Sequence, residues 1–146
     1  MPPTCPEHGD VAMLIAYSLH GHVKQHRLGK VYINDVGFWI ERNPDTVRGP
    51  DITFVRAERA TRSRKFFEGP PDLAIEVVSP NDRYTEVEEK ADDLLRAGAQ
   101  AVIVVDPNRR TVRIHRPNET VNVADALVVD DVVPGWRLPL SEIFEE

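Results

Sequence analysis

The chain has 146 residues and a formal net charge of −6, with 24 acidic side chains against 18 lysines and arginines. This charge excludes a general polyanion-binding surface, because nucleic-acid affinity depends on cations that neutralise phosphates, and it leaves only local basic groups. One cysteine excludes an intramolecular disulfide, and without a membrane-length apolar run or a signal peptide the sequence predicts a cytoplasmic protein with no membrane contact.

The N-terminal third is predicted to hold an irregular lead-in, one helix and a hairpin. Residues 1–7 contain three prolines and are expected to be irregular. Apolar residues at helical spacing predict a helix over about residues 9–27. Two short apolar segments, 30–34 and 37–41, flank turn-forming residues and predict a β-hairpin.

The rest of the chain alternates strands and helices. Residues 51–55 and 72–78 predict two strands that we expect to pair, and Ser79-Pro80-Asn81-Asp82 can cap the helix that follows. Polar loops are predicted at 42–50 and 58–71, that helix at about 84–97, further strands at 101–106, 111–116, near 121 and at 127–129, and a last helical turn at 141–144. This order indicates an α/β fold, one mixed sheet flanked by helices, and the length predicts a single domain over residues 1–146.

The strand DLAIEVV carries a glutamate that needs a partner. Glu76 lies in the middle of this strand, on the same face as Asp72. A desolvated carboxylate there requires a cation, a hydrogen-bond donor or a metal, and the ordinary alternative is an ion pair on a half-exposed face. Lys90 falls on or beside the inner stripe of the following helix, so it either reaches water or points at Glu76.

Asp51 offers a second carboxylate near the first. It follows Pro50 at the start of the strand that is expected to pair with 72–78. An aspartate at a strand end beside Glu76 would give two oxygen ligands to one divalent cation. Mg²⁺ fits such a pair, because it takes one or two carboxylates together with waters and phosphate oxygens.

Basic residues gather in two segments. The first group is Arg56, Arg59, Arg62, Arg64 and Lys65, and the second is Arg109, Arg110, Arg113 and Arg116. Each group is either a solvated surface or a local contact for nucleic acid, and the sequence leaves both interpretations open.

Three segments, VRGPDITFV, PPDLAIEVVSPND and EKADDLLRAGAQAVIVVDP, resemble the Uma-type endonuclease family of the PD-(D/E)XK superfamily, over roughly residues 8–140. The resemblance implies a restriction endonuclease-like mixed β-sheet flanked by helices. It also implies a metal-dependent DNA endonuclease that hydrolyses phosphodiester bonds. The implied cofactor is Mg²⁺, with Mn²⁺ as a substitute, the implied substrate is DNA, and the implied assembly is a homodimer.

The resemblance also assigns roles to individual residues. It implies Asp51 and Glu76 as catalytic metal ligands, joined by the backbone carbonyl of Val77. Val78 stands where the superfamily pattern has a lysine. Lys90 matches the position on the next helix to which this family moves the lysine, and it is therefore the third catalytic candidate.

Two further residues match the family pattern as second-tier candidates. Asp72 matches an aspartate that accompanies the second strand, and His8 matches a histidine near the first helix, for which helix capping or packing is the alternative role. The family usually has an extra acidic segment before residues 2–8, so we expect a shortened start or a missing supporting strand here.

Two other functions stay open. Valine at position 78, the acidic net charge and the short start favour a catalytically inactive nuclease-fold module that binds nucleic acid or a protein partner. The other possibility is an enzyme that uses the same acids for a different hydrolysis. A fold by itself does not decide between these functions.

Overall fold

Helix α1 (Pro6–His26) is the first element of the computed structural model, which describes residues 3–144. It begins three residues earlier than predicted, because a proline is tolerated in the first helical turn, where its missing N–H has no partner to lose. Pro6 and Glu7 are therefore helical, which corrects part of the expected irregular lead-in, and residues 1–2 lie outside the described residues. The helix ends at Arg27, which adopts the left-handed conformation at φ 53°.

Six strands form the central sheet in the order β1-β4-β6-β7-β8-β9. Their bounds are β1 (Gly29–Ile33), β4 (Ile52–Arg56), β6 (Leu73–Val77), β7 (Ala101–Asp106), β8 (Thr111–Arg116) and β9 (Glu119–Asn122). Strands β6 and β7 are parallel and are connected through α2 (Tyr84–Ala97), whereas the other neighbours are antiparallel. The predicted pairing of 51–55 with 72–78 and the mixed α/β fold are confirmed.

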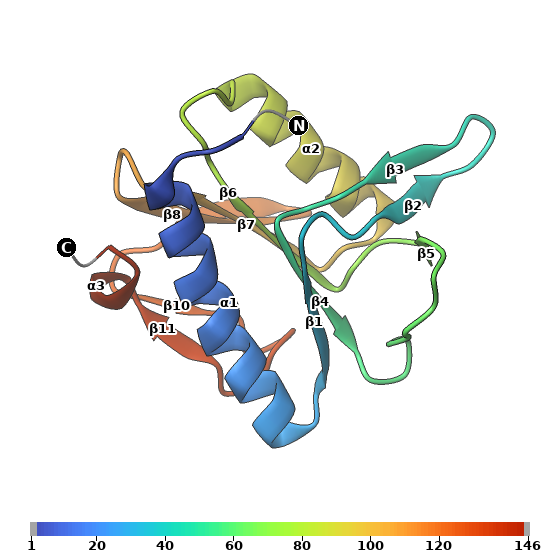
Figure 1. The fold of residues 1–146 in the computed structure, drawn as a ribbon, viewed down its shortest axis with the longest axis horizontal. Coiled ribbons are helices and arrows are strands. Elements are labelled where there is room, and N and C mark those ends of the chain that lie inside the picture. The colour runs from blue at the N-terminus through green and yellow to red at the C-terminus, as the bar shows by residue number, and fades with distance from the viewer. Residues whose placement is uncertain (1–2, 145–146) are drawn as a thin grey trace.

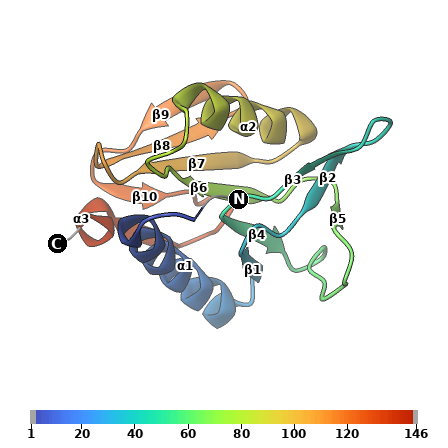
Figure 2. The ribbon, with the colours of Figure 1, turned by 45° about the horizontal axis from the view of Figure 1, so that its top comes forward.

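The two long helices cover opposite faces of this sheet (Figure 2). Because side chains alternate along a strand, Leu73 and Ile75 of β6 join the core beneath α1, while Ala74 between them packs with Ala91 and Leu94 of α2. Residues 74 and 76 have the same parity. Glu76 is therefore on the α2 side of the sheet.

The predicted hairpin between 30–34 and 37–41 is wrong. Strand β1 pairs with β4 in an antiparallel register, and β2 (Phe38–Glu41) pairs instead with β3 (Thr46–Arg48) and β5 (Phe67–Glu68) in a separate sheet. Positive φ angles at Asn34 and Asp35 turn the chain out of the central sheet rather than back along β1. The segments of β3 and β5 were expected to be loops, because strands of two or three residues show no periodicity.

The C-terminal segment closes the α1 side of the core. Strands β10 (Ala126–Val128) and β11 (Arg137–Pro139) form a small antiparallel sheet, followed by α3 (Leu140–Ile143) next to α1 (Figure 1). Trp136 is buried there, and its indole N–H donates a hydrogen bond of 3.0 Å to the hydroxyl of Ser18 on α1. Within residues 3–144, no helix combines the length and hydropathy that a membrane span requires.

Candidate active site

Strand β1 ends, β4 begins and β6 ends at the same end of the central sheet. This end of the sheet is called the acidic edge, after Asp51 and Glu76. The register places Ile52 opposite Ile75, so Asp51 and Glu76 are the next positions on the two antiparallel strands. One carboxylate oxygen of Asp51, Oδ2, accepts a hydrogen bond of 2.8 Å from the backbone N–H of Val77. Since the N–H and C=O of a strand residue point to the same side, the Val77 carbonyl also leaves β6 toward Asp51.

His8 reaches this edge from the first part of α1. Its Nε2 lies 3.5 Å from Oδ2 of Asp51, and the two side chains are 14% and 18% exposed. Two groups from different elements, the Val77 N–H and the His8 ring, therefore hold one oxygen of Asp51. Such contacts fix the rotamer of a carboxylate that has to act on a ligand.

Burial and mutual repulsion dominate the electrostatics of the two carboxylates. Burial raises the pKa of Asp51, while the Val77 N–H and His8 act in the opposite direction. For Glu76, burial and then the charge of Asp51 raise the pKa to about 8, against a lowering effect of Lys90. A pKa of about 8 means that Glu76 is mostly protonated at neutral pH.

Lys90 lies close enough to act on Glu76 through its charge but does not touch it. The side chain is exposed on α2, directly before the buried Ala91, and it forms no ion pair with any residue between 3 and 144. Its positive charge opposes the raised pKa of Glu76. The Lys90 ammonium is therefore an exposed cation without an ion pair among residues 3–144, within electrostatic reach of Glu76.

Two aspartates at this edge were missed by the sequence reasoning. Asp35 in the turn after β1 and Asp82 in the turn before α2 both raise the pKa of Asp51 and of Glu76. The Ser79–Asp82 turn does not cap α2, since the N-cap is Arg83 without a side-chain bond and Asp82 accepts the Ser79 N–H at 2.9 Å instead. Strand topology could have revealed both, because each turn lies where a strand of this edge ends.

Asp72 lies away from the acidic edge, at the other end of β6. Its carboxylate accepts the backbone N–H of Arg56 at 2.8 Å and lies 3.5 Å from Nη1 of Arg59. It lies four positions before Glu76, which corresponds to about 13 Å along a strand. These contacts make Asp72 a link between β4 and β6 rather than a neighbour of the carboxylate pair.

The donor set at the acidic edge fits a hard divalent cation. Among residues 3–144, no three histidine, cysteine, aspartate or glutamate side chains are grouped as metal ligands. Two carboxylates and a backbone carbonyl nevertheless match Mg²⁺, which commonly keeps several waters and takes one or two carboxylates. Burial and then the charge of Asp51 raise the pKa of Glu76, and a cation bound between the two carboxylates would offset this repulsion.

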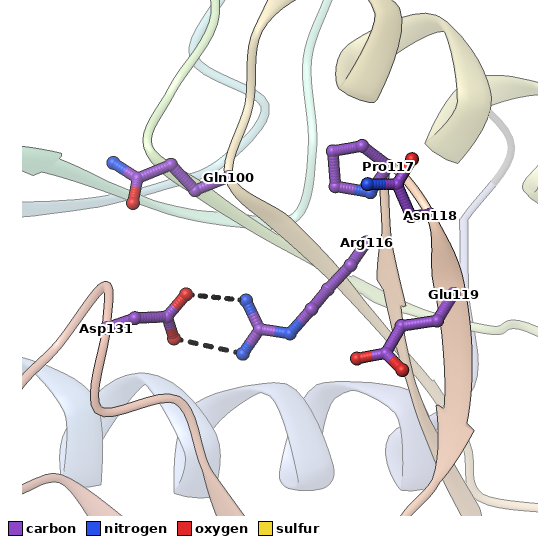
Figure 3. A pocket seen from close by; sticks show the side chains of 6 residues that line it. All are labelled: Gln100, Arg116, Pro117, Asn118, Glu119 and Asp131. Atoms are coloured by element: carbon purple, nitrogen blue, oxygen red, sulfur yellow. Dashed lines mark hydrogen bonds and ion pairs between the residues drawn. The ribbon is translucent and has the colours of Figure 1, made fainter.

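A hollow at the opposite end of the sheet is a different feature (Figure 3). It lies where β7 begins and β8 ends, and its lining residues are Gln100, Arg116, Pro117, Asn118, Glu119 and Asp131. Arg116 and Asp131 are joined by two hydrogen bonds of 2.7 and 3.0 Å. Because these charged groups satisfy each other, the hollow adds nothing to the acidic site.

Comparisons with known proteins agree with this architecture. A family model described as "Uma2: Putative restriction endonuclease" matches residues 1–141. The crystal structure of a "putative nuclease belonging to DUF820" from Anabaena variabilis ATCC 29413 superposes with a TM-score of 0.86 at 22% identity, covering 98% of this chain and 83% of that one. No curated protein matches the sequence. The similarity to the solved structure shows the fold, and the family model confirms the resemblance seen in the sequence.

Proposed function

The chain belongs to the Uma2 family of putative restriction endonucleases, and from this premise we propose that it is a metal-dependent endonuclease that hydrolyses phosphodiester bonds in DNA. Family membership supports a nuclease in general. The observation that carries the finer proposal is the pairing of Asp51 and Glu76 at one sheet edge, with the pKa of Glu76 raised to about 8. Such a pair at neutral pH is suited to exchange a proton for a cation.

The proposed ligands of Mg²⁺, or of Mn²⁺ in its place, are Asp51, Glu76 and the carbonyl of Val77. A bound divalent cation would lower the pKa of a coordinated water and polarise the phosphoryl group. The Val77 N–H and His8 hold Asp51 in one orientation, and the partial burial of Glu76 strengthens electrostatic interactions at its carboxylate. Lys90 supplies the positive charge that offsets the negative charge growing on the phosphate during hydrolysis.

Incubation of supercoiled plasmid DNA with the protein tests this function. We expect nicked and linear DNA with Mg²⁺ or Mn²⁺ and intact plasmid with EDTA, because the two acids cannot act on a phosphate without a cation. Calorimetric titration with Mg²⁺ separates the alternative of an inactive module, which valine at position 78 favours. Metal binding without cleavage would contradict the DNA substrate, and no metal binding would contradict the proposed site.

Replacing Lys90 with methionine is expected to lower the cleavage rate by about 10²–10³-fold, the typical loss when one charge-stabilising donor is removed. Methionine keeps the length and the helix propensity of the side chain. The assay is best run at several pH values above 8, because Lys90 lowers the pKa of Glu76 and its removal shifts the loss of that proton to higher pH. Calorimetry should show nearly the same Mg²⁺ affinity.

The matched control for this variant is Arg96→Met on the same helix, because Arg96 is exposed and its one ion pair within residues 3–144 is with Asp93. It should cleave at the wild-type rate. A wild-type rate in Lys90→Met as well would leave Lys90 as an ordinary surface cation. The homodimer that the family resemblance implies stays a prediction. Light scattering during size-exclusion chromatography would measure the molar mass that tests it.

A further inference from the structure

A groove lined by cations lies where α1 ends and β1 begins. It has a volume of about 580 Å³, and its lining residues are His20, Val23, Lys24, Arg27, Gly29, Lys30, Ala57, Ala60 and Arg62. On α1, His20, Lys24 and Arg27 follow each other at intervals of four and three residues, so they form one stripe. Lys30 and Arg62 approach from two other segments, and the lining contains no acidic residue.

The cations of this groove are not neutralised within the protein. Lys24, Arg27, Lys30 and Arg62 are exposed and form no ion pair with residues 3–144. Arginines elsewhere are mostly paired with acids, among them Arg42, Arg48, Arg56, Arg59, Arg96, Arg113, Arg116 and Arg137. The two basic segments of the sequence thus divide into structural ion pairs and a few free charges, and Arg62 belongs to the free ones.

The acidic edge repels DNA electrostatically, so DNA binding requires cations elsewhere on the protein. Asp35, Asp51, Glu76 and Asp82 gather there, and the whole chain carries a net charge of −6. A duplex bears about one negative charge per 1.7 Å of its axis, so its binding requires unneutralised cations on the protein. The groove concentrates four such cations in one place, and because the proposed substrate is DNA, nucleic acid is the polyanion that it is argued to bind.

The groove and the acidic edge lie at opposite ends of α1. His8 is near the N-terminal end, beside Asp51, and Lys24 is in the last turn, which leads into β1 (Figure 1). Lys24 lies sixteen positions after His8 in the helix, which corresponds to ~24 Å. Along a duplex this corresponds to about seven base pairs at ~3.4 Å each. A phosphate in the groove is therefore far from any phosphate at the carboxylates.

We propose that this groove binds the phosphate backbone of duplex DNA at a distance from the bond that is hydrolysed. The inference rests on the proposed function, because it takes the substrate to be DNA. The contacts are ionic and independent of base sequence, since lysine and arginine side chains on phosphate oxygens fix position without reading bases.

The test compares two triple variants of the full chain that remove the same charge. One is Lys24→Gln/Lys30→Gln/Arg62→Gln in the groove, and the matched control is Arg42→Gln/Arg96→Gln/Arg137→Gln, which removes exposed, paired arginines. Fluorescence anisotropy measures binding of a labelled duplex in EDTA over a range of salt concentrations. Plasmid cleavage with Mg²⁺ is measured on wild type in parallel.

Loss of three phosphate contacts should reduce the slope of log affinity against log salt by about 2.7. Between roughly 50 and 200 mM salt, wild-type affinity should therefore change about 40-fold more than that of the groove variant. The control triple should keep the wild-type slope.

Each result decides a different claim. An unchanged slope in the groove variant, or an equal loss in the control, overturns the groove while wild-type cleavage leaves the nuclease intact. A reduced slope without cleavage by wild type supports the groove and overturns the nuclease. If the groove variant keeps its DNA affinity but loses binding of polyglutamate, the groove takes an acidic polypeptide and the proposal is wrong.

Discussion

Replacing Asp51 with asparagine is expected to lower the rate of Mg²⁺-dependent plasmid cleavage by at least about 10³-fold, equivalent to roughly 4 kcal/mol of transition-state stabilisation. In the wild type the Val77 N–H donates a hydrogen bond of 2.8 Å to the Asp51 carboxylate. Asparagine keeps an oxygen that can accept this bond, so the end of β6 should stay in place. What the variant loses is a negative ligand for the cation. The measurement is cleavage at saturating Mg²⁺, together with calorimetry to follow the weakened metal binding.

Two other aspartates provide the comparison. Asp131→Asn removes an exposed carboxylate that pairs with Arg116, far from the acidic edge, and should cleave at the wild-type rate. Asp72→Asn tests whether Asp72, at the other end of β6 from Glu76, stabilises the fold without taking part in cleavage. It should lose stability, because Arg59 loses its ion pair with Asp72 and Arg56 keeps only the pair with Glu58 among residues 3–144, and it should retain cleavage at temperatures where it is folded. Cleavage by Asp51→Asn at the wild-type rate would remove the carboxylate pair from the mechanism.

Replacing Glu76 with glutamine should stabilise the metal-free protein, increasingly so as the pH rises. The pKa of Glu76 is raised from 4.5 to about 8, so between these values the folded state keeps a proton that the unfolded state has lost. The free energy of unfolding of the wild type therefore falls as the pH rises through this window. The limit set by the shift is roughly 5 kcal/mol at high pH, and glutamine avoids this loss.

Thermal unfolding in EDTA, measured from acidic pH to above pH 8, gives the difference between the two proteins. The midpoints should agree at acidic pH, where both side chains are neutral, and should diverge above it. Glu119→Gln on the exposed strand β9 controls for the loss of a surface charge and should track the wild type. Mg²⁺ should raise the midpoint of the wild type but not that of Glu76→Gln. A constant difference at all pH values would mean that Glu76 is solvated in the folded protein.

The sequence predicted the parts of the fold in which periodicity and length agree. The strand at 72–78, its pairing with 51–55 and the helix at 84–97 were all expected, because each has an apolar pattern that fits one secondary structure. The predicted partner of β1 was wrong, because residues with positive φ, such as Asn34 and Asp35, can either close a hairpin or lead the chain out of the sheet. Local sequence does not distinguish these outcomes, because the choice depends on the pairing of β1 with β4, which lies more than 15 residues later in the chain.

The sequence predicted that Asp51 and Glu76 lie close together but not that Asp35 and Asp82 join them. Glu76 was singled out because a carboxylate in the middle of a strand is costly to desolvate, and Asp51 because it begins the strand expected to pair with 72–78. The register makes the two residues neighbours. Asp35 and Asp82 lie in turns, where aspartate is common for local reasons, so their residue type carried no signal. Asp72 shares its strand face with Glu76, and only the length of β6 and the arginines at its other end separate the two.

The turn between β6 and α2 sets where Lys90 lies relative to Glu76. Residues 78–83 return the chain over its own strand, so Lys90, fourteen positions after Glu76 in the sequence, comes close enough for its charge to act on that carboxylate. One residue inserted into or deleted from α2 before Lys90 would move the amine by about 100° around the helix axis. Evolution is therefore freer to exchange the amino acids of this part of the helix than to alter their number. Homologues that keep the lysine on the helix should keep this spacing even where the intervening letters differ.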